Sequence, residues 1–156
     1  MSAPTPGVSL HASAVIIGAQ GLLLRGSSGA GKSSLALALI AQAQAAGDFA
    51  RLVGDDRVLV EARNGRLIAR PHPSIRGLIE ARGHGLLSLP SAPACVLHLV
   101  IDLVAPGETA PRLPEESEKS IELQGVALPR FYVAGASGDV ACRVPALMRA
   151  ALQHTA

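Results

Sequence analysis

The chain is poor in aromatic and charged residues. It has no tryptophan, one tyrosine and two phenylalanines among 156 residues, and charged residues make up only 17%. Proteins that bind single-stranded nucleic acids use aromatic side chains on which the bases stack, so this class of function is disfavoured. Lys32 and Lys119 are the only lysines, and the net charge of +2 is spread along the chain. No basic cluster indicates a nucleic-acid or membrane surface as a partner.

Cysteines and long apolar runs are also scarce. Cys95 and Cys142 lie among apolar or small residues without a C-x-x-C pattern, so we expect buried free thiols. No apolar run reaches the roughly 18 residues that a membrane span needs. Residues 1–7 lack the basic start and apolar stretch of a signal peptide, and we expect them to be flexible. These absences are typical of a soluble, cytoplasmic protein.

What the chain has in quantity is aliphatic residues. Hydrophobic residues make up 49%, the length suits one domain, and no linker or repeat divides residues 1–156. The expected strands are 12–17, 22–25, 51–53, 57–62, 66–70, 95–104, 121–123 and 130–133. The expected helices are 33–46, with Gly47 as its stop signal, 74–81 and 145–153. An Asn-Gly turn at 64–65 predicts a hairpin, and 105–118 is expected to be a mobile surface loop. The fold class is therefore a single α/β domain.

The clearest motif is Gly26–Ser33, which fits G-x-x-x-x-G-K-[ST] at every fixed position. An apolar strand is expected before it and a helix after it. In such a loop, backbone N–H groups converge on phosphate, and the helix start adds positive potential. Lys32 is expected to reach the β- and γ-phosphates and Ser33 to complete a Mg²⁺ shell. The candidate nucleotide-binding residues are Gly26, Ser27, Ser28, Gly29, Ala30, Gly31, Lys32, Ser33 and Ser34.

A phosphotransferase also needs carboxylates near the metal and near the attacking hydroxyl. Asp102 ends an aliphatic strand in the conventional way, whereas Asp55 and Asp56 are adjacent acids at a shorter strand end. Adjacent carboxylates are costly to hold close unless a cation or a proton-accepting role explains them. A third patch, residues 79–87, combines Glu80 and Arg82 with two glycines that bracket His84, which suits a phosphate or metal site. The pattern alone leaves the choice among these sites open.

Together these motifs resemble the HPr kinase/phosphorylase family. The matches are His11, the Gly26–Ser33 loop, Leu52-Val-Gly-Asp-Asp56 and Glu80-Ala-Arg-Gly-His-Gly-Leu86, in the order that the family has. The resemblance covers about residues 8–90. It implies a P-loop kinase fold, distantly like that of phosphoenolpyruvate carboxykinase. It also implies transfer of phosphate from ATP, with Mg²⁺, to a serine of HPr, the small phosphocarrier of the sugar phosphotransferase system, or of an HPr-like protein.

The resemblance also implies roles for individual residues. The implied catalytic residues are Asp56, Asp55, His11, Lys32 and Arg112, and the implied Mg²⁺ ligands are Ser33 and Glu80. Within the acidic pair, the resemblance favours Asp56 as the acceptor of the serine proton. Arg112 is the nearest equivalent of an arginine that the family carries in the loop before its final strands. Well-known members have a further N-terminal domain, so a short form with the catalytic domain alone is expected here.

Two features separate this chain from the family pattern and from other kinases. The family's late basic stretch, associated with dephosphorylation, corresponds to Val133–Asp139, which contains no arginine, so we expect weak phosphorylase activity. Family members form hexamers, which makes a homo-oligomer an expectation. One alternative is a small-molecule P-loop kinase, but such enzymes need an arginine-rich lid, and 105–118 has only Arg112. The other alternative is an ATP-binding regulator without catalysis, which needs neither Asp56 nor Glu80.

Overall fold

A computed structural model describes residues 7–105, 107–134 and 138–154 of the chain. Within these ranges, nine strands form one sheet in the order β1-β5-β6-β9-β3-β2-β4, with β11 also paired to β9 and β10 paired to β11. Strands β7 and β8 form a separate hairpin. The strands are β1 (Val8–Leu10), β2 (Ala12–Ile17), β3 (Gln20–Arg25), β4 (Ala50–Gly54), β5 (Val58–Arg63), β6 (Arg66–Pro71), β7 (Leu78–Ala81), β8 (Gly85–Ser88), β9 (Cys95–Val104), β10 (Ser120–Leu123) and β11 (Val126–Ala134). The helices are α1 (Lys32–Ala45) and α2 (Gly138–His154), with single 3₁₀ turns η1 (Pro73–Ile75) and η2 (Glu116–Glu118).

Strand β9 is the centre of the sheet. One edge pairs in parallel with β3, while the other edge is shared by β6, antiparallel at its start, and β11, parallel at its end. Leu99 and Ile101 belong to one core and Val100 to the other, so both faces of the strand are buried. Burial on both faces explains the continuous aliphatic run, which correctly predicted this strand.

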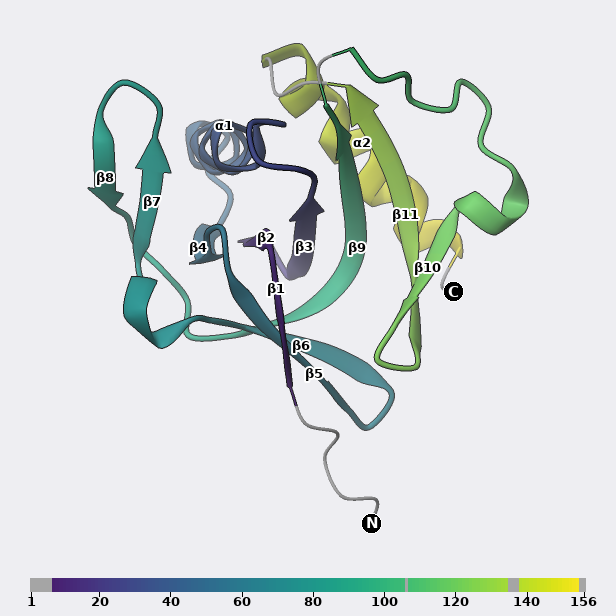
Figure 1. Cartoon of the computed structure of the whole chain (residues 1–156), viewed down its shortest axis with the longest axis horizontal. Coiled ribbons are helices and arrows are strands. Elements are labelled where there is room, and N and C mark those ends of the chain that lie inside the picture. Colours follow the sequence, from purple (N-terminus) through teal and green to yellow (C-terminus); the bar gives the residue numbers. More distant parts are fainter. Residues whose placement is uncertain (1–6, 106, 135–137, 155–156) are drawn as a thin grey trace.

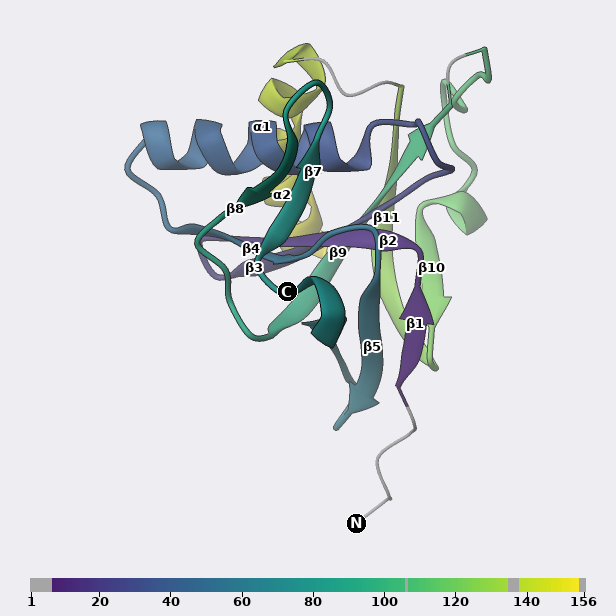
Figure 2. The same ribbon diagram turned by 60° about the vertical axis from the view of Figure 1, so that its left-hand side comes forward.

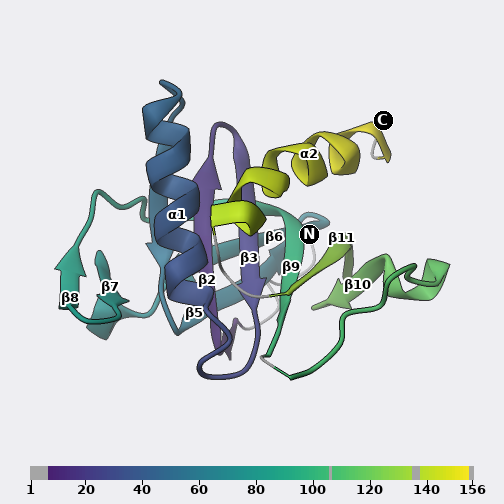
Figure 3. The same cartoon turned by 90° about the horizontal axis from the view of Figure 1, so that it is seen from above.

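The sheet separates two hydrophobic cores. Both helices cover the same face of β2, β3 and β9 (Figures 1 and 3), where Leu35 of α1 and Val144 of α2 pack with Leu24. On the other face, the β5–β6 hairpin closes a second core in which Val60 packs with Val100. Because both cores use the same strands, the described residues form one α/β unit.

Helix α1 follows from its local sequence. Leu35, Leu39 and Ala43 are buried at spacings of four residues, as are Ala36 and Ile40 beside them, so one face of the helix meets the sheet. The helix ends where Gly47, at φ 81°, donates its N–H to the Gln44 carbonyl at 3.0 Å. A left-handed residue just after a helix end favours glycine, and the expected stop signal is confirmed.

The prediction of a helix at 74–81 is wrong. Pro73–Ile75 form a single 3₁₀ turn, the chain reverses at Gly77, and Leu78–Ala81 form β7 instead. Ile79 and Ala81 are buried while Glu80 between them is exposed, which is the two-residue period of a strand. Its partner β8 was not foreseen, because all four of its residues are exposed and show no alternation. The hairpin stands beside α1 (Figure 2), with Ile79 in the helix-side core.

Helix α2 is longer than expected, and it contains a proline. The prediction began at Pro145, but the helix begins at Gly138. Proline has no N–H, so it leaves the carbonyl four residues earlier without its helical partner. Gln42 of α1 fills this position: its Nε2 donates to the Ala141 carbonyl at 3.1 Å. Within the described residues, no helix is both long and apolar enough to cross a membrane.

The two cysteines lie in different environments. Cys95 is buried at the start of β9, as expected, and burial raises the pKa of its thiol to about 12. Cys142 was also expected to be buried, but it is exposed. Cys142 directly follows buried Ala141 on α2. Because one side of an amphipathic helix faces solvent, adjacent residues can differ in burial in this way. Residues 1–6, expected to be flexible, lie outside the described part of the chain.

Candidate active site

The glycine-rich loop joins the end of β3 to the start of α1. Gly31, at φ 103°, precedes the helix, and its carbonyl accepts the N–H of Leu35 at 2.9 Å. A Cβ on Gly26 would lie 2.9 Å from the Leu103 carbonyl oxygen, so the loop leaves the sheet in contact with β9. The first position therefore needs glycine for close approach and the second for its backbone conformation. The expected order of strand, loop and helix is observed.

Lys32 lies beneath this loop. Its side chain is only 6% exposed, and its Nζ donates to the carbonyls of Gly26 at 2.8 Å and Ser27 at 3.2 Å. The ammonium group is thus held against the first two residues of the loop, and Lys32 lines the cavity described below. A lysine held there provides the positive charge that a polyphosphate needs.

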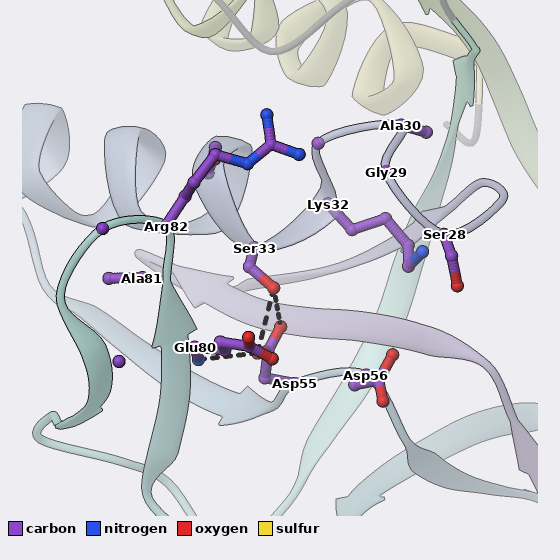
Figure 4. A pocket seen from close by; sticks show the side chains of 14 residues that line it. Ser28, Gly29, Ala30, Lys32, Ser33, Asp55, Asp56, Glu80, Ala81 and Arg82 are labelled. Carbon is purple, nitrogen blue, oxygen red and sulfur yellow. Dashed lines mark hydrogen bonds between the residues drawn. The ribbon is translucent and has the colours of Figure 1, made fainter.

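Asp55 is a buried carboxylate at the end of β4. It is 3% exposed and accepts a hydrogen bond from Ser13 Oγ at 2.7 Å. It also accepts hydrogen bonds from Ser33 Oγ at 2.7 and 3.0 Å and from the Glu80 N–H at 3.2 Å (Figure 4). All these donors are neutral. Across residues 7–105, 107–134 and 138–154, no basic side chain forms an ion pair with Asp55. A buried anion without a cationic partner is costly, and a metal ion would compensate it.

Asp56 lies next to Asp55 but faces solvent. Its Oδ1 is 2.6 Å from His11 Nε2, and the two side chains are 66% and 47% exposed. The backbone turns sharply here: Asp56 has φ 63°, and the Arg57 N–H donates to the Asp55 carbonyl at 2.7 Å. The two adjacent acids therefore have separate surroundings, one among buried hydroxyl groups and the other beside an exposed imidazole.

A cavity of about 740 Å³ connects these elements. It is lined by Ser28, Gly29, Ala30, Gly31, Lys32, Ser33, Ser34, Asp55, Asp56, Glu80, Ala81, Arg82, Gly83 and Gly85. In Figure 4 the Glu80 carboxylate lies beside Asp55, and the Arg82 side chain extends over the start of α1. The described contacts also bring His11 to the cavity, through Asp56.

The structure divides the expected site residues into two groups. Most of the glycine-rich loop and three acidic residues line the cavity, whereas Gly26 and Ser27 contribute only carbonyls to Lys32. Sequence reasoning missed Ser13, which had no motif around it. It placed Arg82 in a patch suited to a phosphate or metal site but did not name it among the catalytic or binding residues.

Asp102, the conventional strand-end candidate, lies outside the cavity. It forms a paired hydrogen bond with Arg25, both distances being 2.8 Å, and Arg130 Nε is 3.8 Å away. The hydrogen bond to Asp102 raises the pKa of Arg25 above its ordinary value, against the opposing effect of burial. Asp102 thus joins three strands through charge pairs. Arg112 is exposed in the segment between β9 and β10 and does not line the cavity either.

Comparisons with known proteins identify the family of the chain. The family model described as the HPr Serine kinase C-terminal domain matches residues 3–144. The chain belongs to this family. Every residue that the resemblance assigned to the site lies inside the range matched by the HPr serine kinase domain.

Individual relatives are similar in sequence to this chain over part of their length. The HPr kinase/phosphorylase of Streptococcus thermophilus is 36% identical over 140 residues, which span 80% of this chain and 41% of the relative. The HPr kinase/phosphorylase of Mycoplasma mycoides is 32% identical over 118 residues, which span 76% of this chain and 35% of the relative. The chain thus covers about two fifths of the length of the curated relatives it matches.

A solved structure shows the same fold. The Hpr(Ser) kinase/phosphatase from Coxiella burnetii superimposes with a TM-score of 0.77 at 24% sequence identity. The match covers 95% of this chain and 98% of that chain. The α/β arrangement of the HPr kinase structure is therefore present here.

Proposed function

We propose that the chain transfers the γ-phosphoryl group of ATP to a serine of HPr or of an HPr-like phosphocarrier protein. Membership of the HPr serine kinase family and the names of its relatives support this proposal. The observation that carries it is that Asp55 and Asp56 lie at one cavity but in different surroundings. Asp55 is buried against Ser33 at the loop, and Asp56 is exposed beside His11.

The loop side of the cavity suits a nucleotide with its metal ion. Ser33, Asp55 and Glu80 offer a hydroxyl and two carboxylates, and such oxygen donors are those that Mg²⁺ prefers. The uncompensated charge of buried Asp55 supports a cation there. When bound, Mg²⁺ would neutralise phosphate charge as the phosphoryl group moves. In this proposal Lys32 and Arg82 hold the phosphate oxygens from either side.

The Asp56 side of the cavity suits the acceptor. The serine Oγ attacks the γ-phosphorus, its proton passes to the Asp56 carboxylate, and the bond to the bridging oxygen breaks to release ADP. The short contact with His11 Nε2 orients the carboxylate for this transfer. A base on the surface is accessible to a hydroxyl carried by another protein, which favours HPr over the small-molecule alternative.

The proposal extends to the whole chain. We treat residues 1–156 as one catalytic domain of the P-loop kinase type, because both cores share one sheet. The distant likeness to phosphoenolpyruvate carboxykinase, a cytoplasmic location and a catalytic role for exposed Arg112 remain predictions. A homo-oligomer is also a prediction, which light scattering of the purified chain tests directly.

The decisive experiment incubates the protein with labelled ATP, Mg²⁺ and the HPr-like proteins of its own genome, and maps the modified residue by mass spectrometry. Label on a serine is expected. Lys32→Ala should lose the label and most ATP affinity in calorimetry, because the ammonium group pairs with phosphate. Lys119→Ala is the matched control, since Lys119 is exposed and pairs with Glu116 outside the cavity. Unchanged ATP affinity in Lys32→Ala would show that the loop does not bind phosphate.

A further inference from the structure

Ser13 is a buried hydroxyl residue on the apolar strand β2. It is 0% exposed, as are its neighbours Ala12 and Ala14. A hydroxyl in such surroundings destabilises the fold unless its hydrogen bonds are made. Both bonds go to the acidic pair: Oγ donates to Asp55 Oδ1 at 2.7 Å and accepts the Asp56 N–H at 3.4 Å. One side chain thus contacts the side chain of one acid and the backbone of the other.

The pairing of β2 with β4 brings Ser13 to this position. Val15 is opposite Leu52, but Ala14 is opposite Gly54, so β4 carries one extra residue, Val53, at this point. An extra residue of this kind is a β-bulge, which bends a strand and changes the direction of the side chains that follow. The acids after Gly54 are therefore directed at the start of β2, where Ser13 lies.

Asp56 needs such support because its backbone conformation is unfavourable. A φ of 63° is uncommon for a residue other than glycine, and the bond from the Arg57 N–H to the Asp55 carbonyl closes a turn of only three residues. Strained turns of this type persist when the surrounding structure holds them. The Ser13 hydroxyl is the side-chain acceptor for the Asp56 N–H, so it helps to hold the turn.

We infer that Ser13 is a positioning residue that fixes the carboxylate of Asp55 towards Ser33 and the turn that presents Asp56 to the acceptor. This inference rests on the proposed function, because it assumes that Asp55 serves the metal side and Asp56 accepts the proton. Ser13 itself touches neither substrate. Its effect should therefore fall on kcat more than on the KM for ATP, since the loop and Lys32 are unchanged.

The test compares Ser13→Ala, Ser13→Cys and Ser13→Thr with the wild type. Ala removes both hydrogen bonds, Cys keeps the size but bonds weakly, and Thr keeps the hydroxyl. Loss of a buried hydrogen bond predicts a fall in kcat of about tenfold or more for Ala and Cys, with the KM for ATP within about twofold. Thr should restore most of kcat. Ser9→Ala, on exposed β1, is the matched control and should behave as the wild type.

A second measurement does not depend on activity. Hydrogen exchange of the Asp56 amide should accelerate about tenfold in Ser13→Ala and Ser13→Cys, because the amide loses its acceptor. If the wild type phosphorylates no acceptor, the proposed function fails, and exchange still tests the geometry. If Ser13→Ala had the same kcat and the same Asp56 amide exchange rate as the wild type, the inference would be overturned. Equal losses in all three variants, in proportion to their thermal stability, would also overturn it, since packing alone would explain them. If the Ala variant does not fold, the Cys variant carries the same comparison.

Discussion

Asp55 and Asp56 show how much two neighbouring residues of the same type can differ. The sharp turn after β4, in which Asp56 has φ 63° and the Arg57 N–H bonds the Asp55 carbonyl, leaves Asp55 buried and Asp56 facing solvent. Asp55 receives hydrogen bonds from Ser13 and Ser33 in the interior, whereas Asp56 meets His11 at the surface. The environment of each residue, rather than its type, supports the separate roles proposed for them.

Replacing each candidate base in turn separates the acidic sites. Asp56→Asn should lower kcat for phosphoryl transfer by 100-fold or more, roughly the contribution of a general base, while ATP affinity stays within about twofold. Asp102→Asn should keep most activity but lose about 1–2 kcal/mol of unfolding free energy, because the Arg25 pair is weakened. Transfer assays and urea denaturation measure the two effects. A larger loss of activity in Asp102→Asn would contradict the assignment.

The cysteines offer a test of burial at single residues. Cys95 has a pKa of about 12 because it is buried, so at pH 8 very little of it is the reactive thiolate. Cys142 is exposed and should react first. We expect one thiol per chain to react rapidly with a disulfide reagent under native conditions, and a second only in denaturant. Cys142→Ser should abolish the rapid reaction, and rapid modification of both thiols would contradict the burial of Cys95.

At the scale of elements, the β7–β8 hairpin completes the cavity from outside the main sheet. It brings Glu80 towards Asp55 and Arg82 towards the start of α1 (Figure 4). Ile79 anchors the hairpin in the core beneath α1. The site is therefore built by three separate elements: the loop before α1, the end of β4 and this hairpin.

The contact between the two helices predicts a measurable stability effect. Gln42 satisfies the Ala141 carbonyl that Pro145 leaves free, so Gln42→Ala should reduce the unfolding free energy by about 1 kcal/mol in urea denaturation. Gln44→Ala is the matched control, because Gln44 is exposed on the same helix and changes helix propensity equally.

Restoring the missing donor provides a further control for this contact. In a Pro145→Ala background, the new N–H can bond the Ala141 carbonyl within α2, so loss of Gln42 should cost less. Equal losses for Gln42→Ala and Gln44→Ala would mean that this contact does not stabilise the docking of α2.

At the scale of the whole molecule, the proposed reaction can be considered in two directions, phosphorylation of the acceptor and its phosphorolysis. Phosphorolysis requires a second anion, inorganic phosphate, beside the phosphoserine, and arginine or backbone donors normally hold it. The candidate stretch Val133–Asp139 has no arginine, and its residues 135–137 lie outside the described part of the chain. Arg143, the next arginine after this stretch, lies on α2, and its guanidinium is 3.8 Å from the Asp139 carboxylate. Its charge is therefore partly compensated.

We expect kinase activity with weak or absent phosphorolysis. The assay contains phosphorylated acceptor, enzyme, Mg²⁺ and millimolar phosphate, and it measures pyrophosphate release. Arg143→Ala should change this rate little, because Arg143 already pairs with an acid. Rapid pyrophosphate production that depends on His11 and Asp56 would show that the chain catalyses both directions.

Local signals in the sequence predicted much of this molecule. The glycine-rich loop, the aliphatic run of β9, the stop at Gly47 and the turn at Asn64-Gly65 each follow from a few consecutive residues. The turn residues have φ 50° and 75°, as an Asn-Gly hairpin requires. Such features depend on backbone conformation and hydrophobic spacing, which neighbouring residues decide. The order of the motifs then indicated the family.

Tertiary structure decided what depends on distant residues. Ser13 and Asp55 are 42 residues apart in sequence, Arg25 and Asp102 are 77 apart, and Gln42 and Ala141 are 99 apart. Residues 78–81 became a strand because β8 was available to pair with them, although a helix was expected there. Burial, hydrogen-bond partners and ion pairs arise only when such segments meet in the fold. That is why the residue pattern alone left the choice among Asp55, Asp56 and Asp102 open and only the family resemblance favoured Asp56, whereas the folded chain places the first two at the cavity and the third outside it.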